Sequence, residues 1–161
     1  RYGSAQYKTL INYAKEKMPN ITLTSDVIVG FPGETFDEFM DTVKLVEEIE
    51  FDNLFTFIYS RRSGTPAAEM NNQIDKDEKS RRFDILLKAL HPISKKKNDL
   101  MFGKIYKVFV EGESKTDKTV LTGRTEGGKT VDFKGDKSLI GKFVNIKIIE
   151  CKTWSLVGKI I

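Results

Sequence analysis

The residues best suited to bind a small ligand in this 161-residue sequence lie in a glycine-proline turn that runs from Gly30 to Gly33. The turn follows three β-branched residues, Val27 to Val29, which are typical of a parallel strand covered on both faces. Glycines at both ends of the turn permit backbone conformations that other residues avoid, and Thr35 with Glu38 has the spacing of a helix capping box. Such a turn leaves backbone N–H groups at the carboxyl end of a strand, where α/β proteins usually bind substrates and cofactors.

The pattern of the turn excludes two common ligand loops. It contains neither the Gly-x-x-x-x-Gly-Lys of a phosphate-binding loop nor the Gly-x-Gly-x-x-Gly of a dinucleotide fold. By pattern alone it fits a ligand loop and, more commonly, an ordinary connection between a strand and a helix.

A second loop, from Arg61 to Ala68, is expected to leave the next strand at the same edge of the sheet. Arg61 and Arg62 have side chains that can clamp a phosphate or a carboxylate. The alternative is a charged surface loop.

Hydrophobic periodicity predicts the elements that hold these loops. A helix with one buried stripe is expected over residues 4–18, a strand over 21–29, a helix over 36–50 and a second strand over 53–60. The last three elements form a βαβ unit. Two parallel strands cannot cover both faces of Val27 to Val29, so the unit is expected to end a larger barrel or sheet. The absence of an initial methionine also suggests a fragment.

A third helix is expected from about residue 76, with four apolar residues between positions 83 and 90 on its inner face. His91-Pro92 is expected to kink or interrupt this helix, because proline removes a backbone hydrogen bond and clashes with the preceding turn.

From Gly103 onward the sequence predicts five short strands, with a hairpin at Glu126-Gly-Gly128. Five strands in this length favour a small barrel similar to the oligonucleotide-binding fold, which often binds RNA through one basic face. Residues 101–161 hold 12 Lys/Arg against 7 Asp/Glu, whereas residues 1–100 hold 15 against 16. The expected partner of this basic part is a polyanion, and a solubilising surface is the alternative.

The candidate residues for the basic face are Lys104, Lys107, Arg124, Lys129, Lys142 and Lys147. Arg124 leads them because it lies beside the glycine turn. Trp154 is expected to be a partly exposed packing residue, with stacking on a base as the alternative.

Cysteine and histidine are too few for a metal site. Cys151 and His91 are the single residues of their types, so the chain has no set of ligands for zinc or an iron-sulfur cluster and no disulfide. Cys151 is expected to be a small buried residue rather than a nucleophile.

Longer stretches of the sequence resemble a known family. Asp26-Val-Ile-Val-Gly-Phe-Pro-Gly-Glu-Thr35 and Phe57-Ile-Tyr-Ser-Arg-Arg-Ser-Gly-Thr-Pro-Ala-Ala68 resemble signatures in the second half of the radical-SAM methylthiotransferases. Gly103-Lys-Ile-Tyr-Lys-Val-Phe-Val-Glu-Gly-Glu113, Leu121-Thr-Gly-Arg-Thr125 and Val131-Asp-Phe-Lys-Gly135 resemble the TRAM domain that ends these enzymes. The resemblance implies an α/β part followed by an all-β part. Residues 1–98 would be the last βα units of a radical-SAM partial TIM barrel with a connecting helix, and residues 99–161 a five-stranded, OB-like TRAM barrel.

The resemblance also implies cofactors for the full-length enzyme, namely S-adenosyl-L-methionine and two 4Fe-4S clusters. The residues that would line the S-adenosylmethionine site are Val29, Gly30, Phe31, Pro32, Gly33 and Glu34, with Phe57 and Tyr59 flanking the adenine. Asp26 would contact the ligand or orient the loop. The family's cluster cysteines are missing from this chain, so it is expected to bind no cluster and to be inactive alone, with no catalytic residue of its own.

The implied reaction adds a methylthio group to C2 of N6-isopentenyladenosine next to the tRNA anticodon. The expected partners are the tRNA anticodon stem-loop and the missing N-terminal domains of the same polypeptide. Branches that act on threonylcarbamoyladenosine in tRNA or on a ribosomal protein are alternatives, as is an RNA-binding module without catalysis. No apolar run reaches the roughly 20 residues of a membrane span and the start has no signal-peptide pattern, so a cytoplasmic location is expected.

Overall fold

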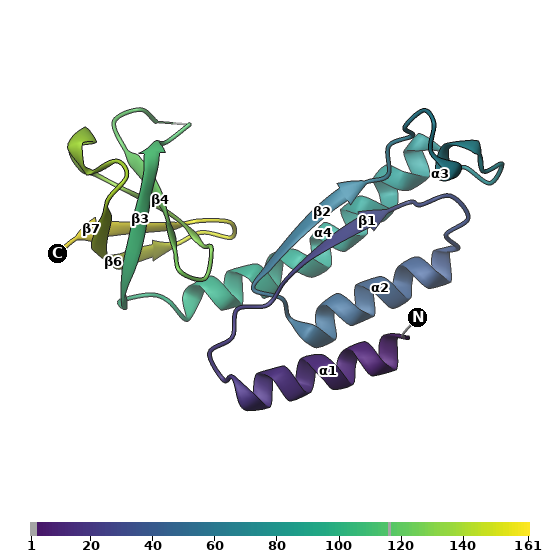
Figure 1. Ribbon diagram of the computed structural model, residues 1–161, viewed down its shortest axis with the longest axis horizontal. Coiled ribbons are helices and arrows are strands. Elements are labelled where there is room, and N and C mark those ends of the chain that lie inside the picture. The colour runs from purple at the N-terminus through teal and green to yellow at the C-terminus, as the bar shows by residue number, and fades with distance from the viewer. Residues whose placement is uncertain (1–2, 116) are drawn as a thin grey trace. The chain divides into compact units, whose positions relative to one another are not determined.

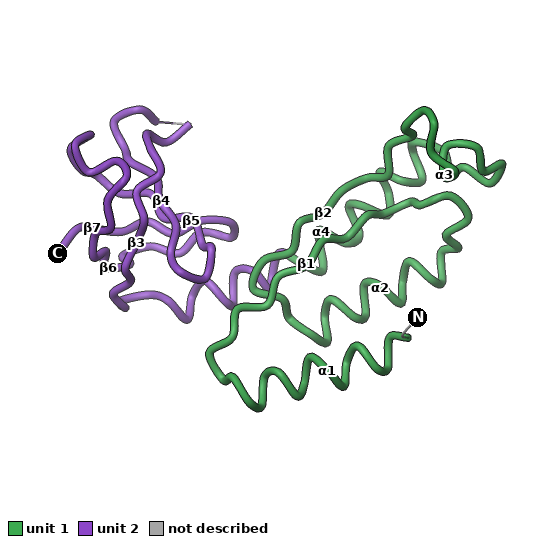
Figure 2. Tube along the Cα trace, viewed as in Figure 1, with its two compact units in different colours: residues 1–90 green, residues 91–161 purple. Residues whose placement is uncertain are grey.

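The computed structural model describes residues 3–115 and 117–161, and the chain divides into two compact units (Figure 2). Unit 1 comprises residues 1–90 and unit 2 comprises residues 91–161. The sequence-based boundary after residue 98 stays a prediction, and the first two residues of that predicted domain lie outside the described part. Of the described helices, none is both long enough and apolar enough to cross a bilayer.

Unit 1 is built on the predicted βαβ element (Figure 1). Strands β1 (Thr24–Val29) and β2 (Asn53–Ile58) run parallel, and helix α2 (Phe36–Ile49) connects them. Both strands are shorter than the sequence predicts.

The capping box at the start of α2 is confirmed. The Glu38 N–H donates to Thr35 Oγ1 at 3.2 Å, and the Thr35 N–H donates to Glu38 Oε2 at 2.8 Å. These two bonds satisfy backbone donors that the first turn of a helix otherwise leaves free. The helix then buries Phe39, Val43, Val46 and Ile49, as its apolar periodicity predicts.

The two-stranded sheet is covered on one face only, which agrees with the expectation that two strands cannot cover both faces of β1. Val29 is fully buried, whereas Ile28 is exposed. In the parallel register Ile28 lies beside Phe57, and Asp26 lies beside Phe55. Because side chains alternate along a strand, these four residues share the open face of the sheet.

Helix α1 (Ser4–Lys17) lies beside α2 (Figure 1), but none of its residues is buried. Lys8 pairs with Glu48, and Lys15 Nζ donates to the carbonyl oxygen of Ile49 at 2.7 Å. The predicted buried stripe is therefore wrong for α1. Polar contacts fix the helix on α2, while its apolar side stays exposed or half-buried.

Helix α4 (Lys76–Asp99) begins in unit 1 and ends in unit 2, after the short helix α3 (Pro66–Glu69). Of the two outcomes expected at His91-Pro92, a kink or an interruption of the helix, the interruption is wrong: Pro92 lies inside α4, and the backbone is helical on both sides of the proline. Leu86 and Leu90 are buried, whereas Phe83 and Leu87 are only partly buried.

Unit 2 is a closed five-stranded barrel, as the sequence predicts. Its strands are β3 (Ile105–Glu113), β4 (Leu121–Thr125), β5 (Thr130–Phe133), β6 (Phe143–Cys151) and β7 (Leu156–Ile160), with a 3-10 turn η1 (Lys137–Leu139) before β6. The strand order around the barrel is β3-β4-β5-β7-β6, and β5 pairs with β7 in parallel. Closure leaves no free sheet edge in the barrel.

The barrel has its own apolar core. Its fully or nearly fully buried members are Val108, Val110, Leu121, Val131, Phe133, Ile146, Ile148 and Leu156. The alternation on β3 and β6 that the sequence predicts places their other side chains on the outer surface.

Candidate functional site

A cavity of about 610 Å³ lies at the carboxyl ends of β1 and β2. Its lining residues are Ile28, Phe31, Phe57, Ile58, Tyr59, Ser60, Arg62, Thr65 and Ala67. Aromatic and aliphatic side chains predominate, with a few polar groups among them, which is the usual make-up of a site for a small ligand. The glycine-proline turn and the arginine loop therefore meet at one edge, as predicted.

Tyr59 is the most informative residue of this cavity. Its ring lies edge-on to the ring of Phe31, with centroids 5.4 Å apart and planes at 69°. Lys79 Nζ donates to the Tyr59 carbonyl oxygen at 3.3 Å and lies 5.7 Å from the ring centroid. The Tyr59 hydroxyl is buried and has no hydrogen-bond partner among the described residues.

Two N–H groups of the glycine-proline turn, those of Gly30 and Gly33, already have partners within the chain, contrary to the expectation that the turn leaves them for a ligand. The Gly30 N–H donates to Glu34 Oε2 at 2.9 Å, and the Gly33 N–H donates to the Asn72 carbonyl oxygen at 2.9 Å. The Glu34 N–H donates to the Phe31 carbonyl oxygen at 3.0 Å. These three donors are taken up by the turn itself and by Asn72, so they hold the shape of the cavity edge instead of binding a ligand.

Both turn glycines are required by the backbone and by close neighbours. Gly30 has φ +76° and Gly33 has φ +85°, a region that residues with a side chain rarely adopt. A Cβ at Gly30 would lie 2.3 Å from Lys79 Cγ, and one at Gly33 would lie 2.3 Å from Asn72 Nδ2. The turn is thus packed closely against Lys79 and Asn72.

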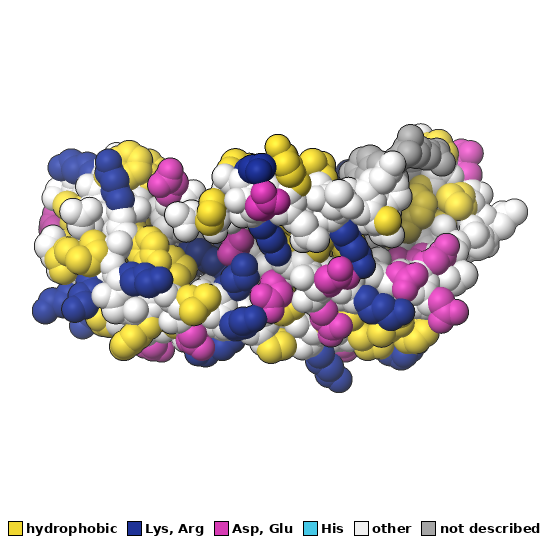
Figure 3. All heavy atoms as spheres, turned by 90° about the horizontal axis from the view of Figure 1, so that it is seen from below, with side chains coloured by type: hydrophobic (Ala, Val, Ile, Leu, Met, Phe, Trp, Pro, Cys, Tyr) yellow, Lys and Arg dark blue, Asp and Glu magenta, His cyan; other side chains and the backbone are white. Residues whose placement is uncertain are grey.

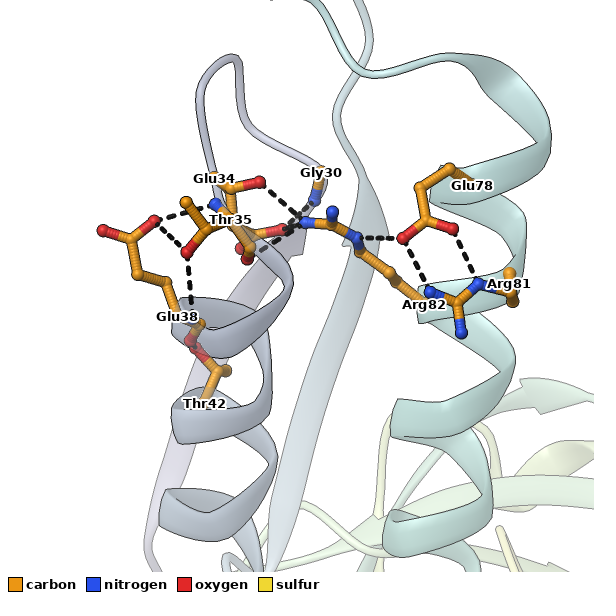
Figure 4. A network of polar contacts seen from close by, with 8 residues as sticks. All are labelled: Gly30, Glu34, Thr35, Glu38, Thr42, Glu78, Arg81 and Arg82. Atoms are coloured by element: carbon orange, nitrogen blue, oxygen red, sulfur yellow. Dashed lines mark hydrogen bonds and ion pairs between the residues drawn. The ribbon is translucent and has the colours of Figure 1, made fainter.

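Glu34 is held by a buried arginine that the sequence analysis did not identify (Figure 4). Arg82 Nη1 donates to the Glu34 carbonyl oxygen at 2.8 Å and forms an ion pair with Glu34 Oε2 at 3.1 Å. It also donates to the Thr35 carbonyl oxygen at 3.3 Å, while Arg82 Nε donates to Glu78 Oε1 at 2.7 Å. Arg82 thereby joins α4 to the turn and to the start of α2.

Glu78 links the two neighbouring arginines of α4. Hydrogen bonds from Arg81 and then from Arg82 lower the pKa of the Glu78 carboxyl from 4.5 to about 2, because both stabilise its charged form. Arg81 lies over the ring of Phe36, with the guanidinium carbon 4.7 Å from the centroid. Glu78, Arg81 and Arg82 together thus fix the first turn of α2 as well as the glycine-proline turn.

The two arginines of the second loop have different positions. Arg61 Nε donates to the Ala68 carbonyl oxygen at 2.6 Å, so this side chain braces its own loop and is not aimed as a clamp. Arg62 lines the cavity. Of the two predicted anion-binding residues, Arg62 is the one placed at the site.

Among the predicted cofactor residues, Phe31, Phe57 and Tyr59 line the cavity. Val29, Gly30 and Pro32 are buried and do not line the cavity, Gly33 is exposed, and Glu34 takes part in the arginine network. Arg82 could have been found from its spacing, because it lies four residues before Leu86 and so falls on the buried face of its helix.

The predicted basic residues of the barrel differ in their exposure to solvent. Lys104, Lys107, Arg124, Lys142 and Lys147 are exposed. Lys129 is buried, with 9% of its surface exposed, which does not suit an RNA-contacting side chain. On the side of the barrel seen in Figure 3, Lys and Arg side chains lie next to exposed hydrophobic side chains. Trp154 is partly exposed, as expected, and lies edge-on to His91 with centroids 5.0 Å apart. Cys151 is half-buried, so the expectation of a buried residue is wrong, and its partial burial raises the pKa of its thiol.

Comparisons with known proteins agree with both units. Residues 99–161 match the TRAM domain family. The chain is 50% identical over 161 residues to the tRNA-2-methylthio-N(6)-dimethylallyladenosine synthase of Acetivibrio thermocellus, and 49% identical over 161 residues to that of Alkaliphilus oremlandii. Both matches cover 100% of this chain and 34% of the relative. A protein of the same name from Clostridium perfringens is 48% identical over 160 residues, which are 99% of this chain and 36% of the relative.

The chain therefore spans about a third of the length of the curated relatives it matches. Identity near one residue in two extends through the βαβ unit, the connecting helix and the barrel. Over its whole length the chain is similar to part of these synthases, in agreement with the radical-SAM methylthiotransferase motifs of its sequence, and residues 99–161 match the TRAM domain family.

Proposed function

We propose that this chain forms one wall of the S-adenosylmethionine site and the RNA-binding barrel of an enzyme that adds a methylthio group to C2 of N6-isopentenyladenosine next to the tRNA anticodon. The observation that carries the proposal is the 50% identity over all 161 residues to a synthase named for this modified nucleoside. Such identity covers the turn, the cavity and the barrel together.

The cavity suits S-adenosylmethionine in its chemistry. Phe31, Phe57 and Tyr59 offer aromatic surface for the adenine. Arg62 supplies a positive charge for the methionyl carboxylate. In the enzymes that the chain resembles, bound S-adenosylmethionine supplies the radical that removes hydrogen from an unreactive C–H bond.

The turn residues act on this site by positioning. Glu34 accepts the Gly30 N–H and is itself held by Arg82, so the turn keeps one shape at the cavity edge. Packing of Gly30 against Lys79 extends this support to the Tyr59 carbonyl oxygen. These residues orient the aromatic wall and exclude water behind it.

The open face of the β1–β2 sheet supports the rest of the proposal. Ile28, Phe55 and Phe57 expose large apolar surface there, which an isolated two-stranded sheet cannot bury. In the complete enzyme, strands from the preceding part of the polypeptide cover this face. Together with β1 and β2 they form the partial TIM barrel, which encloses the cavity. The cluster ligands come from that part as well.

Two phenylalanines of β2 give a matched test in the intact enzyme that carries this sequence. Phe57 lines the cavity and Phe55 lies two residues before it on the same face of the same strand. Phe57→Ala should weaken S-adenosylmethionine binding about tenfold, the usual worth of stacking on a base. Phe55→Ala should leave the affinity unchanged. Calorimetric titration measures both, and equal affinities for the two variants would contradict the proposed wall.

A further inference from the structure

The outer surface of the barrel carries an aromatic pair that neither the basic-face prediction nor the cofactor site explains. Phe109 on β3 and Phe143 on β6 are cross-strand partners, with ring centroids 5.2 Å apart and planes at 53°. They are 39% and 62% exposed. Two large aromatic rings exposed to solvent on adjacent strands do not gain the free energy of burial. Their exposure therefore indicates a surface that binds a ligand.

Cations surround this pair. Arg124 on β4 is the other cross-strand neighbour of Phe109, so Arg124, Phe109 and Phe143 form one row across three strands. Lys107 Nζ lies 4.9 Å from the centroid of the Phe143 ring. Lys147 projects from the same face of β6, since it alternates with the buried Ile146 and Ile148.

Acidic side chains on this face are few. Glu111 forms an ion pair with Arg124 at 2.9 Å, which leaves the face with three cations and one carboxylate among the strand residues named. A surface of this sign is complementary to a chain of phosphates. Exposed aromatic rings flanked by cations suit unpaired bases, because stacking uses the flat face of any base while the cations follow the backbone.

The neighbouring face of the barrel lacks these features. The outward residues of β4 and β5 are Thr122, Arg124, Thr130 and Asp132. That face is the one that barrels of the oligonucleotide-binding type commonly use. It offers here neither an aromatic ring nor a second cation, so the ligand surface is displaced onto β3 and β6.

We infer that Phe109 and Phe143 form a stacking platform for unpaired nucleotides of RNA on the β4–β3–β6 face, with Lys107, Lys147 and Arg124 along the phosphate backbone. The inference rests on the proposed RNA-binding function and names the surface and the kind of RNA. It excludes Lys129, which is buried.

The test measures RNA binding by the chain with substitutions that keep the bulk apolar. The probe is a fluorescent oligoadenylate of about 10 nucleotides, within the length that such barrels bind. A duplex of the same length is the comparison. Phe109→Leu and Phe143→Leu should each weaken binding of the single strand about five- to tenfold, the lower range for a lost base stack, and leave duplex binding unchanged. Phe143→Tyr, which keeps an aromatic ring, should bind the single strand as tightly as the unsubstituted chain.

A matched control is available in the same unit. Phe102, in the turn before β3, is 63% exposed and lies outside the platform. Phe102→Leu should leave the affinity unchanged. With 2-aminopurine in the oligonucleotide, the unsubstituted chain should quench the probe's fluorescence by stacking, and Phe143→Leu should abolish the quenching. Circular dichroism checks that each variant keeps its barrel.

The salt dependence of RNA binding distinguishes the contribution of the two phenylalanines from that of the lysines. Lys107→Gln or Lys147→Gln should each lower the slope of log affinity against log salt by about 0.7, whereas Phe143→Leu should leave the slope unchanged. If the lysine variants lose affinity and the phenylalanine variants do not, the platform is overturned while RNA binding stands. If the phenylalanine variants change only self-association in light scattering, the face is a protein interface and the platform is overturned. If the unsubstituted chain binds neither RNA, the proposed RNA-binding function fails with it.

Discussion

The guanidinium of Arg82 and the carboxylate of Glu34 form the ion pair that ties helix α4 to the glycine-proline turn, with Nη1 and Oε2 3.1 Å apart (Figure 4). Arg82 is 6% exposed, so water screens the pair little. Because the same Glu34 oxygen accepts the Gly30 N–H, an arginine 48 positions along the chain sets the shape of the turn.

Arg82→Gln should open the turn. The substitution leaves the largely buried Glu34 without its cation, and breaking a buried pair in this way costs about 3 kcal/mol. Hydrogen exchange measured by mass spectrometry reports the effect locally. The amide of Gly30 should exchange about a hundredfold faster, because its bond to Glu34 loses its support.

Arg81→Gln is the matched control for that change. Arg81 is the adjacent residue and also bonds Glu78, but its side chain is 53% exposed and it does not reach the turn. An exposed ion pair contributes at most about 1 kcal/mol, so exchange at Gly30 should stay close to that of the unsubstituted chain. Equal exchange in both variants would refute the role of Arg82 in positioning the turn.

Glu78 should make unit 1 sensitive to acid. Its folded pKa of about 2 lies below its ordinary value of 4.5, owing to hydrogen bonds from Arg81 and then Arg82. The unfolded chain therefore binds the proton first as pH falls, and the stabilisation that is complete above the ordinary value is lost progressively as pH falls toward the folded pKa. Glu78→Gln removes this contribution at every pH.

Urea unfolding of both proteins between about pH 6 and pH 2 measures the effect by linkage. The difference in unfolding free energy between the unsubstituted chain and Glu78→Gln should shrink on acidification. Glu47→Gln, at an exposed carboxyl on α2, controls for the change in net charge. A difference that stays constant with pH would rule out the arginine contacts as the cause.

Gly123 should be irreplaceable in the barrel. A Cβ there would lie 2.4 Å from the Phe109 carbonyl oxygen and 2.7 Å from Val108 Cγ1, and the first of these is backbone that cannot move aside. Overpacking of this kind costs about 2 kcal/mol, so Gly123→Ala should lower the unfolding midpoint of unit 2. Trp154 is the single tryptophan and lies in this unit, so its fluorescence follows the transition.

Gly112→Ala provides the comparison within β3. No atom lies within 4 Å of a Cβ at that position, so the midpoint should be unchanged or slightly raised. Similar losses for the two glycines would show that steric contact with β3 is not the reason for Gly123.

Anaerobic reconstitution with iron and sulfide should give no cluster on this chain. Cys151 is its one cysteine, and no group of three or more metal-binding side chains occurs within residues 3–115 and 117–161. Iron-sulfur clusters require several thiolates, so the absorption spectrum should lack the cluster band. Appearance of that band would contradict the expectation that cluster ligands lie elsewhere in the enzyme.

Local features of this fold could be predicted from sequence. The capping box of Thr35 and Glu38, the hairpin at Gly128 and the alternation of Val108 and Val110 depend on neighbouring residues or on one strand, and all three are confirmed. Phe57 and Tyr59, which the family motifs include, line the cavity.

Long-range contacts could not be predicted in the same way. Helical spacing from Leu86 places Arg82, and not its neighbour Arg81, on the buried face, but no local pattern identifies Glu34, 48 positions earlier, as its partner. The predicted apolar stripe of α1 shows what periodicity alone cannot predict. Periodicity identifies the side of a helix able to pack, but whether that side is covered depends on the rest of the tertiary structure.

The most direct test of the central claim replaces the matching third of the Acetivibrio thermocellus relative with these 161 residues. The chimera is expressed in a bacterium that lacks its own synthase, and the nucleosides of its tRNA are measured by mass spectrometry. If the chain supplies the cofactor wall and the RNA-binding barrel, N6-isopentenyladenosine should be converted to its 2-methylthio form, and Phe57→Ala should reduce the conversion. A soluble, cluster-loaded chimera that leaves isopentenyladenosine unmodified would contradict the account.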